Sequence, residues 1–378
     1  MRYFLAKNAV LKLLENPSVY QMETDELYEL DNGALTFLSE CSSESGHESE
    51  ETGFVRYCLQ EGILTSCAVP ARRWPLIKSP DPSLRYLELQ ITDKCNLKCG
   101  HCYLGDGRSR ELPVRHIRNL LHEFEELQGL RVLITGGEPF LHSGFDEINA
   151  MLPDFAIRKV LVTNGLLLHE RILDTLHVDE IQISIDGLED AHDSLRGKGT
   201  FRTAMEKIKL SRAYGFEVSV STMIHSKNLG DFDEMERLLK DMGIREWTVD
   251  VPCVTGRLAA REELQVSHRE AGKYLLYGYG AGLHGSAEGF ACGLHLASVT
   301  AEGTVSKCTF YANRAAGRIE EGLGECWKRI KPIRLDTLKC DCVNIESCRG
   351  GCRYRADVLG DPMGKDLYRC ALYDIIDY

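Results

Sequence analysis

The stretch Ile-Thr-Asp-Lys-Cys-Asn-Leu-Lys-Cys-Gly-His-Cys-Tyr (residues 91–103) decides the fold of this chain. It places Cys95, Cys99 and Cys102 on one short loop in the spacing C-x-x-x-C-x-x-C, and no fourth Cys lies nearby. Three thiolates suit three corners of a cubane iron–sulfur cluster and leave the fourth iron open for chemistry. Structural zinc takes four nitrogen or sulfur ligands, and an odd number of cysteines disfavours disulfides. We therefore predict an iron–sulfur cluster on this loop.

A second run, Thr135-Gly136-Gly137-Glu138-Pro139, follows farther along the chain. Together the two runs resemble the radical S-adenosylmethionine (SAM) superfamily. The resemblance implies that the open iron of a 4Fe–4S cluster chelates SAM and that one electron cleaves SAM to a 5′-deoxyadenosyl radical. It also implies SAM contacts by His101, Tyr103, Gly136, Gly137, Glu138, Ser184 and Arg196. Of these, Arg196 suits the SAM carboxylate, because a guanidinium can bind a carboxylate through two hydrogen bonds. No catalytic protein residue is singled out.

Composition limits the class of protein. The chain has 378 residues, which suggests two or three domains, and a formal net charge of −12, which argues against binding nucleic acid through its phosphates. No stretch reaches the length of a membrane span, and the N-terminus lacks the apolar core of a signal peptide. Fifteen cysteines without a secretion signal point to metal ligation in a reducing, cytoplasmic environment.

Short apolar runs alternate with helical patterns from Tyr86 onward, as in β/α units around a parallel sheet. We predict strands at 86–92, 131–136, 159–165, 180–186, 217–224 and 246–251. We predict helices at 113–128, 144–152, 168–177, 201–214 and 231–242. Six strands fit the partial (β/α)6, TIM-like barrel of radical SAM enzymes, so the fold class is α/β. Both motifs would then lie at the carboxyl ends of strands, where ligands bind in such folds.

We divide the chain into four segments: residues 1–70, a proline-rich linker at 71–85, the radical SAM core at 86–285, and residues 286–378. In the first segment, Ser18–Met22 and Glu26–Leu30 predict a hairpin, Asp31-Asn32-Gly33 a turn, and two helices and a return strand follow. This segment resembles the winged-helix-like peptide-recognition domain of peptide maturases. The resemblance implies that it binds the leader of a ribosomally made precursor peptide, which adds as a strand to the sheet edge.

The last ninety residues hold a second set of cysteines, in a pattern that includes C-x-C-x5-C-x3-C. It resembles the auxiliary-cluster (SPASM) domain of peptide-modifying radical SAM enzymes, although one residue, Asp341, replaces the usual two in the first pair. The resemblance implies two further 4Fe–4S clusters. The distal cluster would take Cys340, Cys342, Cys348 and Cys370, and the proximal one Cys292, Cys308 and Cys352. The fourth proximal ligand is either Cys253 or absent, with the iron open to substrate.

These features predict a radical SAM maturase of a ribosomally synthesised (RiPP) peptide that forms a thioether or another side-chain cross-link. Its partners would be the precursor peptide and an electron donor such as flavodoxin or ferredoxin, with no nucleic acid and no membrane. Three alternatives stay open: maturation of anaerobic sulfatases, modification of tetrapyrroles, and a non-catalytic scaffold that presents peptide. Sulfatase maturases carry an Asp directly after the Cys that matches Cys308, where this chain has Thr309.

Overall fold

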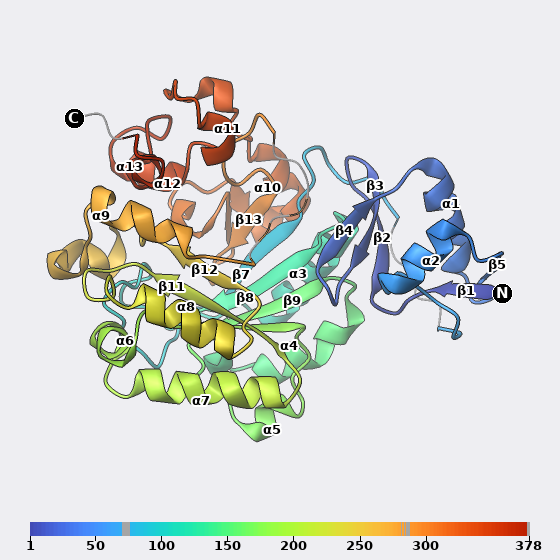
Figure 1. Cartoon of the computed structure of the whole chain (residues 1–378), viewed down its shortest axis with the longest axis horizontal. Coiled ribbons are helices and arrows are strands. Elements are labelled where there is room, and N and C mark those ends of the chain that lie inside the picture. Colours follow the sequence, from blue (N-terminus) through green and yellow to red (C-terminus); the bar gives the residue numbers. More distant parts are fainter. Residues whose placement is uncertain (70–75, 281, 283, 285–287, 376–378) are drawn as a thin grey trace.

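A computed structural model describes residues 1–69, 76–280, 282, 284 and 288–375. Its centre is a nine-stranded sheet in the order β12-β11-β10-β9-β8-β7-β13-β14-β15. The first six of these strands run parallel and curve into a partial barrel (Figure 1). They are β7 (Tyr86–Thr92), β8 (Arg131–Gly136), β9 (Arg158–Thr163), β10 (Glu180–Ser184), β11 (Glu217–Met223) and β12 (Trp247–Asp250). The six predicted strands are thereby confirmed.

Helices connect these strands in the manner of β/α units. They are α3 (Val114–Glu126), α4 (Phe145–Met151), α5 (Glu170–Leu173), α6 (Glu189–Arg196), α7 (Thr200–Ala213) and α8 (Phe232–Asp241). Their apolar faces pack on the strands: Ile117, Leu121 and Phe124 of α3, for example, are buried in the main core. The helix predicted at 168–177 is only the short α5, and the sequence prediction missed α6.

The C-terminal segment adds strands to the barrel sheet. Strand β13 (Leu296–Val299) pairs in parallel with β7, and β14 (Thr304–Ser306) and β15 (Gly317–Arg318) continue the sheet antiparallel. The helices that follow the barrel are α9 (His268–Gly272), α10 (Leu323–Arg329), α11 (Ile345–Cys348), α12 (Arg353–Val358) and α13 (Leu367–Leu372). The predicted border at residue 286 lies outside the described residues, and the sheet is continuous from β7 to the strands beyond that border.

The N-terminal segment folds on its own small core beside the barrel (blue in Figure 1). It has two sheets, β2-β3-β4 and β5-β1-β6, and two helices. Their bounds are β1 (Arg2–Leu5), β2 (Ala9–Leu13), β3 (Pro17–Gln21), β4 (Glu26–Glu29), α1 (Asn32–Cys41), β5 (His47–Glu48), α2 (Gly53–Gln60) and β6 (Leu64–Thr65). The β3–β4 hairpin is confirmed. The turn predicted at Asp31-Asn32-Gly33 is instead the start of α1, because the Asp31 side chain accepts from Ala34 N and caps the helix.

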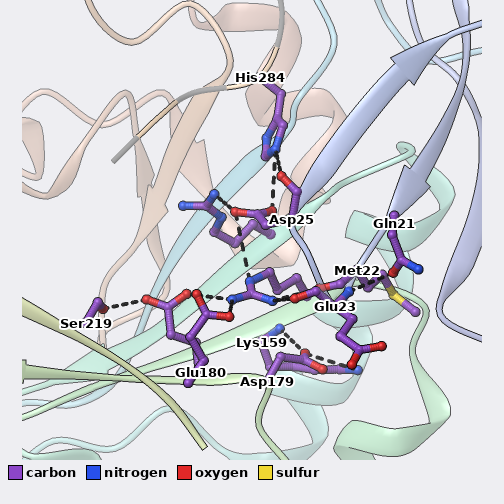
Figure 2. A network of polar contacts seen from close by, with 12 residues as sticks. Gln21, Met22, Glu23, Asp25, Lys159, Asp179, Glu180, Ser219 and His284 are labelled. Atoms are coloured by element: carbon purple, nitrogen blue, oxygen red, sulfur yellow. Dashed lines mark hydrogen bonds and ion pairs between the residues drawn. The ribbon is translucent and has the colours of Figure 1, made fainter. Parts of the chain in front are cut away.

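A buried network of charges joins the β3–β4 hairpin to the amino ends of the barrel strands (Figure 2). Asp25, at the tip of the hairpin, forms an ion pair with Arg131. Arg158 donates to Met22 O at 2.7 Å and to Glu180 and Glu217 at 2.8 and 3.0 Å. His284 Nε2 lies 3.5 Å from Asp25 Oδ1. The hairpin is therefore fixed to the barrel by groups from both sides.

Among the residues that the structure describes, none of the helices is long and apolar enough to cross a bilayer.

Candidate active site

A cavity of about 720 Å³ opens at the carboxyl ends of the barrel strands. Side chains from the ends of β8 to β12 form its walls, and the cysteine loop after β7 forms one side. The predicted site residues that line it are Cys95, Cys99, His101, Cys102, Tyr103, Gly136, Gly137, Ser184 and Arg196. The volume is in the range of sites that enclose a small ligand. The two motifs, distant in sequence, thus meet in one cavity.

The cysteine loop is held in place from several directions. Gly100 N donates to Leu195 O at 2.8 Å, and Cys102 O accepts from Arg257 N at 3.0 Å. Asn96 Oδ1 accepts from Asn164 Nδ2 at 2.8 Å, which ties the loop to the end of β9. These bonds orient all three thiols toward one cavity, as a shared cluster requires. Burial raises the pKa of the Cys95 thiol to about 11, so metal binding must release its proton.

In the described part of the chain, no group of three or more His, Cys, Asp or Glu side chains is arranged to hold a single metal ion. A cubane cluster places each thiolate on a different iron atom, so its cysteines stand farther apart than the ligands of one ion. The loop fits the cluster in residue type, in number and in the face that it presents to the cavity.

The Gly136-Gly137 turn packs directly on the start of the cysteine loop. Gly137 N donates to Thr92 O at 2.9 Å, and Glu138 N donates to Lys94 O at 2.8 Å. A Cβ at Gly136 would overlap Thr92 O, and one at Gly137 would overlap Lys94 O. The absence of side chains at these two glycines therefore allows the two loops to touch. Any larger residue here would displace the cysteine loop.

Glu138 lies behind the cavity wall. Its carboxylate is fully buried and accepts from Thr163 Oγ1 at 2.8 Å and from Asn164 N at 3.0 Å. It is absent from the described residues that line the cavity, although the resemblance implied a SAM contact. Its visible role is to lock the ends of β8 and β9 together. Burial raises the pKa of Glu138 to about 7, although the hydrogen bonds it accepts oppose the shift.

This raised pKa predicts a pH dependence of stability. Between about 4.5 and about 7, the unfolded chain has lost the Glu138 proton while the folded chain keeps it. The stability that Glu138 contributes is therefore present below pH 4.5 and is lost as the pH rises through about 7. We expect the unfolding free energy of wild type, measured by urea denaturation without cofactors, to fall by on the order of 3 kcal/mol relative to Glu138→Gln over this range. Parallel pH profiles for the two proteins would contradict this placement of the carboxyl.

Arg196 and Asp186 form a buried ion pair at the cavity wall. Arg196 Nε donates to Asp186 Oδ2 at 2.5 Å, and Asp186 Oδ1 accepts from Met223 N at 2.7 Å. The Arg196 guanidinium holds the pKa of Asp186 well below its usual range, although burial opposes this. Both side chains line the cavity, as does Ser184 two residues before Asp186. Arg196 is thus positioned by Asp186 while it faces the space that a ligand would fill.

His101 and Tyr103 flank the last loop cysteine. His101 is partly buried, its Nε2 is 3.9 Å from Asp186, and its buried Nδ1 has no partner among the described residues. Burial lowers the pKa of His101 to about 4, which keeps the ring neutral at pH 7. The Tyr103 ring lies 5.4 Å from that of Phe310, which follows Cys308 by two residues. An unpartnered polar nitrogen facing a cavity suits a bound ligand.

The C-terminal cysteines, which we predict to form two groups, influence one another's pKa values. Burial raises the pKa of the Cys308 thiol, and the thiols of Cys292 and Cys352 contribute to the rise. Likewise Cys348 and Cys340 raise the pKa of Cys370. The Cys253 thiol hydrogen-bonds Cys352, and this contact lowers the pKa of Cys352 to about 6 and raises that of Cys253. Of the cysteines outside the loop, Cys253 is the one found in the cavity lining of the described residues.

Residues 89–239 match the family model of the radical SAM superfamily. These residues make up about two fifths of the chain, and this part is similar to the radical SAM superfamily. The match implies SAM and a 4Fe–4S cluster as cofactors, and Cys95, Cys99 and Cys102 are the residues that fit that cluster.

Curated relatives match part of this chain. It is 27% identical over 211 residues, 54% of the chain, to the AdoMet-dependent heme synthase of Nitratidesulfovibrio vulgaris, of which it covers 58%. It is 30% identical over 176 residues, 44% of the chain, to the antilisterial bacteriocin subtilosin biosynthesis protein AlbA of Bacillus subtilis, of which it covers 39%. The chain thus spans about half the length of the curated relatives it matches.

A solved structure shares the fold over more of the chain than these curated relatives match. The crystal structure of Streptococcus suis SuiB bound to precursor peptide SuiA superposes with a TM-score of 0.67 and 15% identity. This likeness covers 97% of the present chain and 99% of that chain, so it includes the N-terminal and C-terminal segments as well as the barrel.

Sequence reasoning missed several residues that line the cavity, among them Glu88, Arg257 and Phe310. Arg257 and Phe310 reach the site through long-range folding, and no local pattern marks them. Glu88 did leave a signal, because it is an acidic residue in the middle of the otherwise buried strand β7.

Proposed function

We propose that this protein modifies a ribosomally made precursor peptide and forms a cross-link between two of its side chains. The observation that carries the proposal is the combination of an open cavity in a radical SAM barrel with a small sheet that has a free edge and is fixed to the same barrel. A small-molecule substrate needs only the cavity. A peptide leader needs a second surface, and the N-terminal segment offers one.

That surface is the edge strand β4 and the aromatic side chains beside it. Strand β4 is the last in the order β2-β3-β4 and pairs with β3 on one side alone. Tyr28 of β4 lies edge-to-face with Tyr57 of α2 at 6.1 Å, and Phe54 and Tyr57 are 39% and 45% exposed. An added strand would hydrogen-bond to β4 and cover these rings with its side chains. The proposed recognition domain comprises residues 1–70, and 71–75 of the proposed linker lie outside the described residues.

Within the cavity, the chain's own residues position the reactants. When bound, the cluster and SAM supply a 5′-deoxyadenosyl radical that takes hydrogen from the substrate. The loop of Cys95, Cys99 and Cys102 would hold the cluster, and Arg196, His101 and Tyr103 present their side chains to the same space. The strand ends form the other walls of this space. The core of the peptide would reach the cavity while β4 holds the leader.

The two C-terminal cysteine groups are proposed to hold two auxiliary clusters. Cys340, Cys342, Cys348 and Cys370 would hold the distal one, and Cys292, Cys308 and Cys352 the proximal one. The contact between Cys253 and Cys352 supports Cys253 as the fourth proximal ligand. Because Cys253 also lines the cavity, this cluster would stand next to the substrate. An external donor such as flavodoxin or ferredoxin would supply the electrons.

Tetrapyrrole modification is the second candidate, favoured by the match to the heme synthase of Nitratidesulfovibrio vulgaris. That match covers 54% of this chain, whereas the likeness to peptide-bound SuiB covers 97%. A tetrapyrrole would leave the β4 edge and its aromatic side chains without a function. The peptide is therefore the better substrate, and the two candidates differ in whether β4 matters for turnover.

The test is Tyr57→Arg, with a fluorescently labelled precursor peptide as the probe. We expect its affinity for the purified protein, measured by fluorescence anisotropy, to fall by about tenfold to a hundredfold, because the apolar area that a leader buries against Tyr57 is worth roughly 1.5–3 kcal/mol. Mass spectrometry after co-expression should show correspondingly less modified peptide. Tyr214→Arg is the matched control, since Tyr214 is a tyrosine of similar exposure on the outside of the barrel. Equal affinity of the Tyr57 and Tyr214 variants would refute the β4 surface.

A further inference from the structure

Five carboxylates line the cavity: Glu88, Asp93, Asp106, Asp186 and Asp250. The four aspartates are engaged by other groups of the protein. Asp186 pairs with Arg196, Asp250 with Arg355 and Asp106 with Arg257. Asp93 accepts from the backbone N–H groups of Arg108 and Arg110 at 3.0 and 2.6 Å. Each of the four aspartates is thus either neutralised by a cation or bound by backbone N–H groups. These contacts hold parts of the cavity wall together.

Glu88 differs from them because one of its two oxygens has no partner among the described residues, and no cation of the described residues pairs with it. One carboxylate oxygen, Oε2, accepts from Thr309 Oγ1 at 2.7 Å and from Thr309 N at 3.2 Å. The other, Oε1, has no hydrogen-bond or ion-pair partner among the described residues. The Oε1 atom is not among the buried, unpartnered atoms of the described residues, so it remains accessible from the cavity that Glu88 lines. Orienting Thr309 requires only the Oε2 atom of Glu88. This structural contact therefore does not explain why the side chain carries a second carboxylate oxygen that has no partner among the described residues.

Glu88 lies between the cysteine loop that follows β7 and the C-terminal segment that contains Cys308. Thr309 follows Cys308 directly, and its hydroxyl lies 3.0 Å from Ser298 Oγ of β13, the strand that pairs with β7. Across the same cavity wall, Glu88 is near enough to Tyr103 to contribute to that residue's raised pKa after burial. A substrate side chain in the cavity therefore meets the cysteine loop and Glu88 together.

We propose that Glu88 is the proton acceptor for the donor atom of the peptide cross-link. The proposal rests on the proposed function, in which a heteroatom X of one peptide residue (sulfur, oxygen or nitrogen) bonds to a carbon of another. In the step assigned to Glu88, the X–H bond breaks and its electron pair stays on X. The proton forms an O–H bond with Oε1, and Glu88 becomes neutral. The carbon that X bonds to has lost its hydrogen atom to the 5′-deoxyadenosyl radical, and the one surplus electron of the new bond would pass to an oxidised iron–sulfur cluster held by the C-terminal cysteines. Thr309 keeps Oε2 fixed during the transfer, which presents Oε1 to the substrate.

The test is Glu88→Gln, which keeps size and can still accept from Thr309 but cannot take a proton. The readout is the ratio of cross-linked peptide to 5′-deoxyadenosine, measured by mass spectrometry in one reaction with the precursor. We expect this ratio to fall about a hundredfold or more, because a general base typically accelerates a reaction by at least that factor. Glu88→Ala with added acetate should recover part of the ratio, because acetate replaces the missing carboxylate. Glu170→Gln, the same change on the exposed face of α5, is the control and should match wild type.

An unchanged ratio in Glu88→Gln would overturn the proposal. So would a variant that fails to bind iron or SAM at wild-type levels, because Glu88 would then be a structural residue. If the proposed function itself is wrong, the result is distinguishable, because the wild-type protein will also leave the precursor peptide unmodified. In that case 5′-deoxyadenosine would form without any cross-link in every variant, and the inference about Glu88 would fall with the function.

Discussion

Simultaneous replacement of Cys95, Cys99 and Cys102 by alanine is expected to abolish cleavage of SAM and to leave the other clusters in place. All three thiols face the cavity, and without them no iron remains there to chelate SAM. Anaerobic reconstitution of wild type should give about twelve irons, four for each of three cubanes, and the triple variant about eight. Iron analysis and chromatography of 5′-deoxyadenosine after reduction with dithionite measure both effects.

Cys67→Ala is the control for this experiment, since Cys67 is an exposed thiol outside all three cysteine groups. It should keep the iron content and the SAM cleavage of wild type. A triple variant that is folded but contains no iron would contradict separate auxiliary clusters. A triple variant that still produces 5′-deoxyadenosine would contradict the assignment of the loop.

Loss of Arg158 is expected to lower the free energy of unfolding by about 3–5 kcal/mol, the cost of leaving buried charges without their partner. The Arg158 side chain is 1% exposed and pairs with Glu180 and Glu217. It also donates to the backbone oxygen of Met22 in the N-terminal segment (Figure 2). Arg158→Ala therefore removes a charge partner from the barrel and one contact that fixes the β3–β4 hairpin to it.

Urea denaturation measures this loss, and Arg171→Ala on the exposed side of α5 is the matched control. The control should change the free energy of unfolding by less than about 0.5 kcal/mol. If Arg158→Ala also changes the free energy of unfolding by less than about 0.5 kcal/mol, the charge network in Figure 2 does not stabilise the contact between the N-terminal segment and the barrel.

The barrel could be predicted from the sequence because its signals are local. Each parallel strand is a short apolar run, and the glycines and cysteines of the two motifs follow β7 and β8 directly. Strands β1 and β2 were missed because they are short and carry Arg2 and Lys12 within them. Lys12 is nevertheless buried, since Nζ donates to Gly129 O of the barrel at 2.7 Å. That contact spans more than a hundred residues, and no local pattern indicates it.

The residues of the candidate active site could likewise be predicted only where a local sequence motif marks them. The motifs gave the cysteine loop, the glycine turn and Arg196, which line one cavity. They did not show that Glu138 turns away from the cavity toward Thr163, because the direction of a side chain depends on the neighbouring strand. They also did not show that Thr309 and Glu88 meet, since these residues are 221 positions apart and are brought together only by the pairing of β13 with β7.

The most direct test of the central claim is isotope transfer from a deuterated precursor peptide. Wild-type protein is reduced with dithionite and incubated with SAM and the precursor carrying deuterium on its carbon atoms. If the cavity activates a peptide, mass spectrometry will find deuterium in the 5′-deoxyadenosine, and the peptide will have lost the corresponding mass. If 5′-deoxyadenosine contains no deuterium and the peptide mass is unchanged, while a tetrapyrrole added in its place is modified, the peptide is not the substrate.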